Sequence, residues 1–304
     1  MSNIGQIEAS LLTDIGQKRD TNQDFVAYWQ PNTEEEEDKH GWLYIVADGV
    51  GGADAGDFAS RFASEQTIES YLNNEAELHW GQRLVKSMQI ANTNLRQYVA
   101  ENTENSRMAT TMVAAIIYKS HLFVTNVGDS RGYLWQNGQF SQITKDQSLV
   151  AKLVEEGAIS EEEAKEHPHG NIILSSLGSE ANPQIDLFDF KLQSGDILLL
   201  CSDGLTKYVE DDEIAQVIQS GSPSEASQKL IRMANERGGS DNISVGIVHY
   251  FPQKTAVFKT KPKPKKESQN HSGVKSRSLL WGYTAFLSLV QTALICLVWA
   301  LLRV

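Results

Sequence analysis

Four aspartates stand at the ends of apolar stretches, where β-strands would run out into loops. Asp48 follows WLYIVA and Asp203 follows ILLLCS, and each is itself followed by glycine. Asp129 follows LFVTNVG, and Asp241 precedes NISVGIVHY. A carboxylate at the edge of a hydrophobic core is costly unless water, hydrogen bonds or a cation compensates it. If the strands are neighbours, the four side chains converge into an all-oxygen cluster, the ligand set that Mg²⁺ and Mn²⁺ prefer.

An Asp-Gly pair also has a simpler interpretation, because Asp starts turns and Gly accepts a positive φ. Turn chemistry explains one such pair better, whereas two pairs and two further acids favour a metal site. Zinc is not indicated, because no His or Cys group has the spacing of zinc ligands. His167 and His169 come nearest and are interpreted as loop histidines. Cys201 lies in the run Leu-Leu-Cys-Ser-Asp, which indicates a residue of a strand core rather than a nucleophile.

Two features suit a phosphate group. The segment TDIGQKRDTNQD, residues 13–24, holds one guanidinium, Arg19, and guanidinium groups bind phosphate oxygens in a bidentate fork. On local grounds alone, an ordinary loop ion pair explains Arg19 slightly better. The glycine-rich run 49–56 could present backbone N–H groups to an anion. It lacks the Gly-Lys-Ser/Thr of a P-loop and the spacing of a dinucleotide fingerprint, so a tight turn into a helix is the alternative.

Strand-like and helix-like segments position these residues. The hydrophobic patterns predict strands over 25–29, 42–47, 112–118, 121–127, 132–135, 139–143, 197–201 and 243–250, and helices over 55–72, 82–101, 211–219 and 224–237. Lys119-Ser120 and Asn137-Gly138 indicate hairpin turns. The acidic run 34–38 is interpreted as a charged loop. Strands and helices are grouped rather than regularly alternating, which predicts an α+β fold.

The charge of the chain is unevenly distributed. The 304 residues have a net charge of −12, but residues 254–277 contain eight Lys or Arg and one Glu. Residues 1–253 therefore carry −20, and a domain this acidic repels the phosphates of nucleic acids. We expect no nucleic-acid partner. Two cysteines and an N-terminus without an apolar core indicate neither a disulfide framework nor a secretory signal.

Residues 279–302 contain no charged side chain. As a helix rising 1.5 Å per residue they would extend about 36 Å, more than the ~30 Å of a hydrocarbon core. The pattern predicts a transmembrane helix in the lipid bilayer, preceded by a basic disordered linker over 254–278. Because basic residues flank spans on the cytoplasmic side, we expect a single-pass membrane protein whose acidic domain faces the cytoplasm.

Six segments, taken in order, resemble the motifs of the protein phosphatase 2C family, the metal-dependent serine/threonine phosphatases, in its bacterial form. They are TDIGQKRDTNQD (13–24), VADGVGGADAG (46–56), MATTMV (108–113), NVGDSRGYL (126–134), LLLCSDGL (198–205) and SDNISV (240–245). They span about 13–250, nearly the whole acidic domain. The resemblance implies a β-sandwich of two antiparallel sheets flanked by helices. Residues 1–253 would be the catalytic domain, with a flap at about 147–183.

The resemblance implies ligands for two Mn²⁺ or Mg²⁺ ions. Asp48 would bridge the two ions, and the Gly49 carbonyl would bind one of them. Asp203 and Asp241 would complete the protein ligands of the other ion. Together the ions would lower the pKa of a bridging water, and the resulting hydroxide would attack phosphorus in line, without a phosphoenzyme.

Further roles follow from the same resemblance. Asp24 would hold metal-bound water, and Asp129 would support a third, weaker ion together with Asp203. Arg19 would bind the phosphate of the substrate and act with Asp48 in catalysis. The substrates would be proteins phosphorylated on serine or threonine. A membrane serine/threonine kinase and its targets are expected among them.

Two positions depart from the family's pattern. Val50 stands where many eukaryotic members carry a histidine proposed as general acid, so another group would protonate the leaving oxygen. Gln23 replaces the commoner Glu of Asn-Glu-Asp, which lowers the negative charge near one ion. Two alternatives stay open at this point. The complete set of acids with Arg19 argues against a catalytically silent binding domain, and the sequence does not decide against a phosphatase of small molecules.

Overall fold

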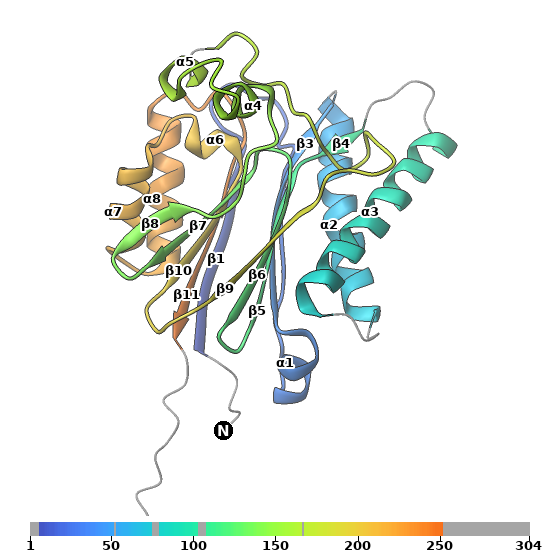
Figure 1. The fold of residues 1–304 in the computed structure, drawn as a ribbon, viewed down its shortest axis with the longest axis vertical. Helices are drawn as coiled ribbons and strands as arrows, with labels where there is room; N and C mark the ends of the chain where they lie inside the picture. Colours follow the sequence, from blue (N-terminus) through green and yellow to red (C-terminus); the bar gives the residue numbers. More distant parts are fainter. Residues whose placement is uncertain (1–5, 52, 75–78, 103–107, 166, 252–304) are drawn as a thin grey trace, which may run out of the picture. The chain divides into compact units, whose positions relative to one another are not determined.

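The computed structural model describes residues 6–51, 53–74, 79–102, 108–165 and 167–251. Two antiparallel sheets pack face to face (Figure 1). The first has the strand order β1 (Gln6–Asp14), β11 (Ile243–Phe251), β10 (Ile197–Cys201), β7 (Arg131–Gln136) and β8 (Gln139–Gln142). The second has the order β2 (Asp24–Trp29), β3 (Trp42–Val50), β5 (Met112–Tyr118), β6 (His121–Val127) and β9 (Asp186–Lys191), with β4 (Ala109–Thr110) paired to β3.

The apolar runs are nearly continuous because both faces of the central strands are buried. In β3, Tyr44 and Val46 belong to the core between the two sheets, whereas Leu43 and Ile45 belong to the core beneath the helices. Successive side chains of a strand point to opposite faces, so one strand contributes to two cores. Strand β10 does the same, with Leu198 directed inward toward the other sheet.

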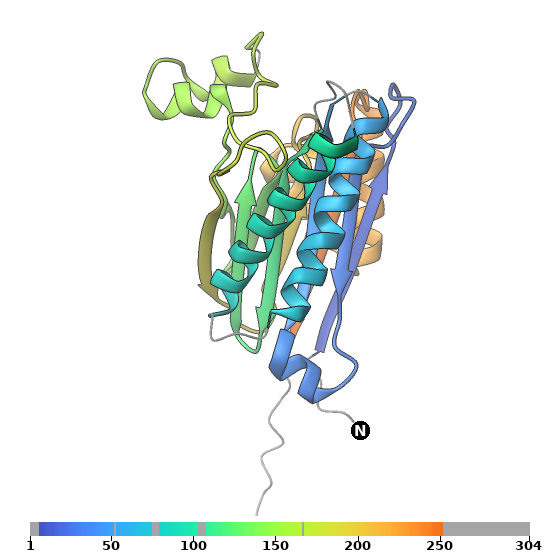
Figure 2. The ribbon, with the colours of Figure 1, turned by 90° about the vertical axis from the view of Figure 1, so that its right-hand side faces the viewer.

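Helices cover the outer face of each sheet. Helices α2 (Ala53–Asn73) and α3 (Trp80–Asn102) run side by side over the second sheet, as Figure 2 shows. Helices α6 (Asp203–Thr206), α7 (Asp211–Ile218) and α8 (Pro223–Glu236) cover the first sheet. Helix α8 begins with Pro223 and a capping box between Ser222 and Glu225, a strong N-terminal signal in the sequence.

The segment between β8 and β9 contains α4 (Leu149–Glu155) and α5 (Glu161–Lys165). These two helices stand beyond the ends of the sheets (Figures 1 and 2). The bridges Thr110–Leu177 and Ser148–Ile173 fasten the segment at its base. It contains the residues expected to form the flap.

The acidic run 34–38 is not a loop, as we had expected, but part of α1 (Glu34–His40). Thr33 caps this helix by accepting a hydrogen bond from the Glu36 N–H at 3.2 Å. The four glutamates 34–37 lie in the first turn, at the positive end of the helix dipole, and Lys39 lies in the last turn. These capping signals outweigh the high charge of the run.

The predicted strands and long helices are confirmed, with ends shifted by a few residues. Lys119 and Asn137 have positive φ in the two predicted hairpin turns. The prediction missed β1 and β9, which both lie at a sheet edge, the two-residue strand β4 and the short helices α4, α5 and α6. Strand β1 pairs with β11 from Gln6 opposite Phe251 to Asp14 opposite Ile243.

The predicted fold class needs one correction. The α+β sandwich is confirmed, but none of the helices in the described parts of the chain is long and apolar enough to cross a membrane. The longest ones, α2 and α3, carry charged residues along their length, Arg61 and Glu65 in the first and Lys86 and Arg96 in the second. The span expected at 279–302 lies outside the described residues and is not part of the observed fold. The linker at 254–278 and the membrane location concern the same undescribed region and stay predictions.

Candidate active site

The register of the second sheet brings Asp24 and Asp48 together. Asp24, the first residue of β2, lies directly opposite Asp48 of β3. We had expected β3 to stop before Asp48, but it continues to Val50 because Gly49 and Val50 pair with β4. The sequence around either aspartate does not predict this pairing, because the strand register joins residues that are 24 positions apart.

The backbone of Asp48 is held by two threonines of the MATTMV segment. The Thr110 hydroxyl donates to the Asp48 carbonyl at 2.8 Å, and the Thr111 N–H donates to the same oxygen at 2.9 Å. The Asp48 N–H donates in turn to the Thr111 hydroxyl at 3.3 Å. These threonines were not among the predicted site residues, although they lie within a motif that resembles the family. Their contacts leave the Asp48 carboxylate available to a ligand.

Gly49 lies where no side chain fits. Its N–H donates to the Gln23 carbonyl at 3.0 Å, and a Cβ on Gly49 would lie 2.1 Å from the Gly56 carbonyl oxygen. The glycine therefore lets the start of α2 and the loop before β2 approach β3 closely. This close packing, rather than an anion site, explains the glycine at this position.

Asp203 and Asp129 reach the same region from the first sheet and from the β6–β7 turn. Asp203 begins α6 one residue after the end of β10, and it lies close enough to Asp48 for their charges to interact. Asp129 is 9% exposed and lies close enough to Asp203 and Asp48 for their charges to interact. These strand-end carboxylates therefore lie close enough together for their charges to interact, which agrees with the predicted convergence.

Burial and mutual repulsion disfavour ionisation of these carboxyl groups. Burial, reinforced by the charge of Asp203, raises the pKa of both Asp24 and Asp129 to about 7. Burial is also the main cause that raises the pKa of Asp48 and of Asp203, and neighbouring aspartates add to it in both cases. Several carboxylates at this position can be ionised together only if a positive charge neutralises them.

Two carboxylate oxygens are buried without a hydrogen-bond partner among the described residues, Oδ1 of Asp24 and Oδ1 of Asp203. Such atoms are rare in folded proteins and call for an ion or a water. The donor set is all oxygen, which fits Mg²⁺ or Mn²⁺. Within the described residues, no three His, Cys, Asp or Glu side chains form a ready-made metal cage. The carboxylates that fit the ions thus lie near one another without enclosing a site by themselves.

Asp24 is held from the first sheet by Ser202, which was not among the predicted site residues. The Ser202 hydroxyl donates to Oδ2 of Asp24 at 2.7 Å and accepts from the Ser244 N–H at 2.9 Å. Ser202 precedes Asp203, so the residue that binds Asp24 is followed by one whose charge interacts with that of Asp48. The hydrogen bond from Ser202 to Asp24 links the two sheets at the site.

Arg19 is brought to Asp241. Its Nη2 lies 2.8 Å from Oδ1 of Asp241 and donates to Oδ2 at 2.9 Å, while its Nε donates to the Ser240 carbonyl at 3.3 Å. The Arg19 side chain is 46% exposed and Asp241 21% exposed, so the pair lies at the solvent-facing rim. An Arg–carboxylate pair is the loop ion pair that we had weighed against phosphate binding, and its place beside the carboxylates is compatible with both.

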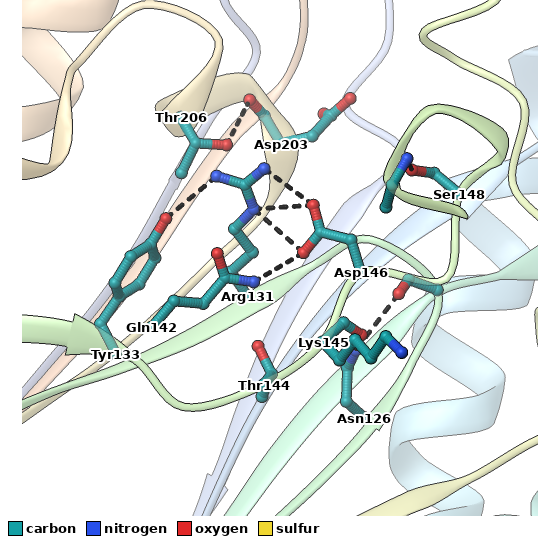
Figure 3. Close-up of polar contacts among 12 residues, drawn as sticks. Asn126, Arg131, Tyr133, Gln142, Thr144, Lys145, Asp146, Ser148, Asp203 and Thr206 are labelled. Atoms are coloured by element: carbon teal, nitrogen blue, oxygen red, sulfur yellow. Dashed lines mark hydrogen bonds and ion pairs between the residues drawn. The ribbon is translucent and has the colours of Figure 1, made fainter. Parts of the chain in front are cut away.

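A second arginine lies beneath the site. Arg131, the first residue of β7, donates from Nε and Nη2 to Asp146 at 2.7–3.1 Å and from Nη1 to the Tyr133 hydroxyl at 3.1 Å (Figure 3). Figure 3 shows its guanidinium close to Asp203. The charge of Arg131 lowers the pKa of Asp203, opposing the effect of burial. Arg131 was not among the predicted site residues. It lies in the NVGDSRGYL segment, and its positive charge could have indicated a role near the carboxylates.

Cys201 lies in the core between the first sheet and its helices, as predicted. Burial raises the pKa of its thiol to about 12, so it carries no thiolate at neutral pH.

Comparisons with known proteins agree with this geometry. The family model for protein phosphatase 2C matches residues 17–237. The serine/threonine phosphatase stp of Listeria welshimeri is 40% identical over 249 residues, which cover 80% of this chain and 95% of the relative. The crystal structure of serine/threonine phosphatase Stp1 from Staphylococcus aureus is similar with a TM-score of 0.73 and 34% identity, covering 82% of this chain and 97% of that one.

A further similar structure is described as the catalytic domain of the serine threonine protein phosphatase PstP in complex with two manganese ions. It has a TM-score of 0.69 and 29% identity, and the match covers 81% of this chain and 98% of that one. With the family model matching more than half of the residues, the chain belongs to the protein phosphatase 2C family of serine/threonine phosphatases, in its bacterial form.

Proposed function

We propose that this protein hydrolyses phosphoserine and phosphothreonine in proteins with the help of two Mn²⁺ or Mg²⁺ ions. The observation that supports this best is the group of buried, mutually repelling carboxylates with unpartnered oxygens on Asp24 and Asp203. Such a group needs a cation, and the relatives that share the fold are named serine/threonine phosphatases. The two ions in the PstP structure give the expected number.

Asp48, the Gly49 carbonyl, Asp203 and Asp241 would hold the two ions, and Asp24 would orient water beside them. Asp129, next to Asp203, would support a third and weaker ion. The bound ions supply Lewis acidity and an activated water for in-line attack on phosphorus. The protein holds the acceptor oxygens in place through the contacts of Thr110 and Thr111 with the Asp48 backbone.

Arg19 would bind the substrate phosphate. Its guanidinium lies at the solvent-facing rim and is already directed toward Asp241, where a phosphate would meet both the ions and the arginine. The guanidinium fork would neutralise negative charge on the phosphoryl oxygens as that charge shifts during phosphoryl transfer. The substrate phosphate would compete with the Asp241 carboxylate for the Arg19 guanidinium, because both groups are anions.

Val50 is 38% exposed and directly follows Gly49. An aliphatic side chain cannot donate a proton, so the leaving oxygen of phosphoserine would take its proton from water or from another group. This expectation separates the protein from family members with a histidine at that position.

The physiological substrates would be phosphoproteins, among them a bacterial serine/threonine kinase and its targets. The phosphoprotein substrates are supported by the names of the relatives, which are a serine/threonine phosphatase and a protein phosphatase. The kinase is an expectation from the family resemblance. A comparison of phosphoproteins in cells with and without the gene would identify them.

The test of the proposed activity uses a phosphothreonine peptide and a panel of small phosphorylated metabolites. Wild-type protein with Mn²⁺ should release phosphate from the peptide, lose this activity on EDTA treatment and regain it with added Mn²⁺. Asp48→Asn and Asp203→Asn should lose it by more than about 100-fold, as expected when a preorganised catalytic group is removed. Equal turnover in wild type and variants would contradict the proposal, and preferential hydrolysis of metabolites would assign a different substrate class.

A further inference from the structure

Asn242 is a buried side chain, 3% exposed, that directly follows Asp241. Its Oδ1 accepts a hydrogen bond from the Gln23 N–H at 2.8 Å. Its Nδ2 donates to the Ile15 carbonyl at 2.9 Å and to the Thr21 carbonyl at 3.0 Å. One amide group thus binds three backbone groups, all of them in the loop between β1 and β2.

These three contacts surround Arg19 in the chain. Residues 17–20 are exposed, so no hydrophobic core fixes the course of this part of the loop. Ile15 lies four residues before Arg19 and Thr21 two residues after it, and both are bound to the same amide nitrogen. The side-chain amide of Asn242 therefore sets the distance between the two ends of the segment that carries the Arg19 guanidinium.

Asn242 also sets that segment relative to the carboxylate facing Arg19. Asp241 is its chain neighbour, and the Asn242 N–H donates to Oδ1 of Asp241 at 3.0 Å. Gly16 packs against the same peptide, since a Cβ on Gly16 would lie 2.1 Å from the Asp241 carbonyl oxygen. The Gln17 N–H donates to the Gly239 carbonyl at 2.7 Å, a further contact between the two loops.

We propose that Asn242 is the positioning residue for Arg19, which it holds at the phosphate-binding rim by fastening both ends of the arginine-bearing segment to the Asp241 loop. The inference rests on the proposed function, because it takes Arg19 as the phosphate-binding group. Asn242 contacts no substrate and acts only through the loop.

The described chain offers a matched control in Asn92 of α3, which is 1% exposed. Its Oδ1 accepts from the Gly178 N–H at 2.7 Å, and its Nδ2 donates to the carbonyls of Glu180 and Ala181 at 3.1 and 3.3 Å. Asn92 therefore makes the same set of contacts as Asn242, but to residues 178–181 at the end of the segment expected to form the flap, which does not carry Arg19. Asn92→Ala and Asn242→Ala remove equal numbers of buried hydrogen bonds.

The experiment is a double-mutant cycle of Asn242→Ala with Arg19→Ala, at saturating Mn²⁺. The readouts are KM and kcat for p-nitrophenyl phosphate and the inhibition constant of inorganic phosphate. Asn242→Ala should raise KM and the phosphate inhibition constant about 10-fold with a smaller change in kcat, because misplacement of a binding group weakens its contacts. In the Arg19→Ala background the same change should add less than about twofold, since coupled residues are not additive. Asn92→Ala should leave the phosphate inhibition constant unchanged.

Asn242→Asp serves as a second variant that keeps the shape of the side chain if the alanine variant does not fold. It keeps the acceptor for the Gln23 N–H and loses both donors, so it should show the same dependence on Arg19. Effects that are fully additive with Arg19→Ala, or a shift only in the Mn²⁺ concentration needed for half-maximal activity, would overturn the inference. A wild-type protein without phosphatase activity would instead overturn the proposed function.

Discussion

The guanidinium of Arg19 lies 2.8 Å from the carboxylate of Asp241, although 222 positions separate the two residues in the chain. The pair joins the group expected to bind phosphate to a group expected to bind metal. Both side chains are partly exposed, and an ion pair of this kind stabilises a protein by about 0–1 kcal/mol. We therefore expect the pair to affect phosphate binding more than the stability of the folded protein.

Replacing Arg19 tests this distinction. Arg19→Lys keeps the charge but loses the fork, so KM for p-nitrophenyl phosphate should rise about 10-fold while the melting temperature changes by less than about 2 °C. Arg61→Ala is the control, since the Arg61 side chain on α2 is 47% exposed, close to the 46% of Arg19, and also pairs with an aspartate, Asp57. The control should change neither quantity. A KM unchanged by Arg19→Lys would contradict a phosphate-binding role.

Stability without divalent ions should depend on pH through Asp24 and Asp129. Their pKa is about 7 in the folded protein, compared with about 4 in an unfolded chain. The folded state therefore binds more protons between these values, and their contribution to stability is complete below pH ~4 and is lost as pH rises through ~7. The melting temperature of EDTA-treated protein should fall between pH 5 and pH 8.

Added Mn²⁺ should reverse this trend, because a cation favours the ionised carboxylates. We expect the rise in melting temperature on Mn²⁺ addition to be larger at pH 8 than at pH 5, measured by differential scanning fluorimetry. Asp129→Asn should flatten the pH dependence of the EDTA-treated protein, since it removes one titrating group. A melting temperature independent of pH in the absence of Mn²⁺ would show that these carboxyl groups do not titrate as described.

The ion pair beneath the site should matter for stability. Arg131→Met leaves Asp146, whose side chain is 12% exposed, without its guanidinium partner. Removing one partner of a mostly buried pair should lower the free energy of unfolding by about 2–4 kcal/mol, measured by urea denaturation. Lys145→Met breaks the exposed Lys145–Glu155 pair and should cost less than about 1 kcal/mol. Equal losses in the two variants would argue against a structural role for Arg131.

Val50→His tests the missing general acid. A histidine at this position would be partly exposed, and its pKa would lie near ~6.5. It should raise kcat for a phosphoserine peptide, whose alkoxide leaving group needs a proton, and leave kcat for p-nitrophenyl phosphate unchanged. The pH–rate profile for the peptide should gain a descending limb above that pKa. Val50→Asn controls for polarity alone and should produce no such limb.

Particular residues show how far the sequence predicts the fold. Strand β10 was predicted with correct ends because its apolar run is buried on both faces. Strand β9 was missed because its side chains alternate between partly buried and exposed at a sheet edge, which weakens the hydrophobic signal. Helix α1 was mistaken for a loop because its charge hid the Thr33 cap. Local patterns thus identify the buried elements better than the peripheral ones.

The site was predictable in its acids but not in its connections. Asp48, Asp129 and Asp203 were found because each one ends an apolar run. Ser202 and Asn242 act through contacts with residues 178 and up to 227 positions away, and no local pattern indicates such partners. Their contacts form only because the folded sheets bring these distant residues together.

The pairing of β1 with β11 has a consequence for synthesis in the cell. Strand β1 finds its neighbour only when β11, 229 to 245 positions later in the chain, has also left the ribosome. Until then the nascent chain exposes the unpaired edge of β1 and lacks Asp241 and Asn242. Pairing over such separations is slow. Phosphatase competence should therefore be acquired after translation of the whole sandwich, and shortened translation products should be inactive and prone to aggregate.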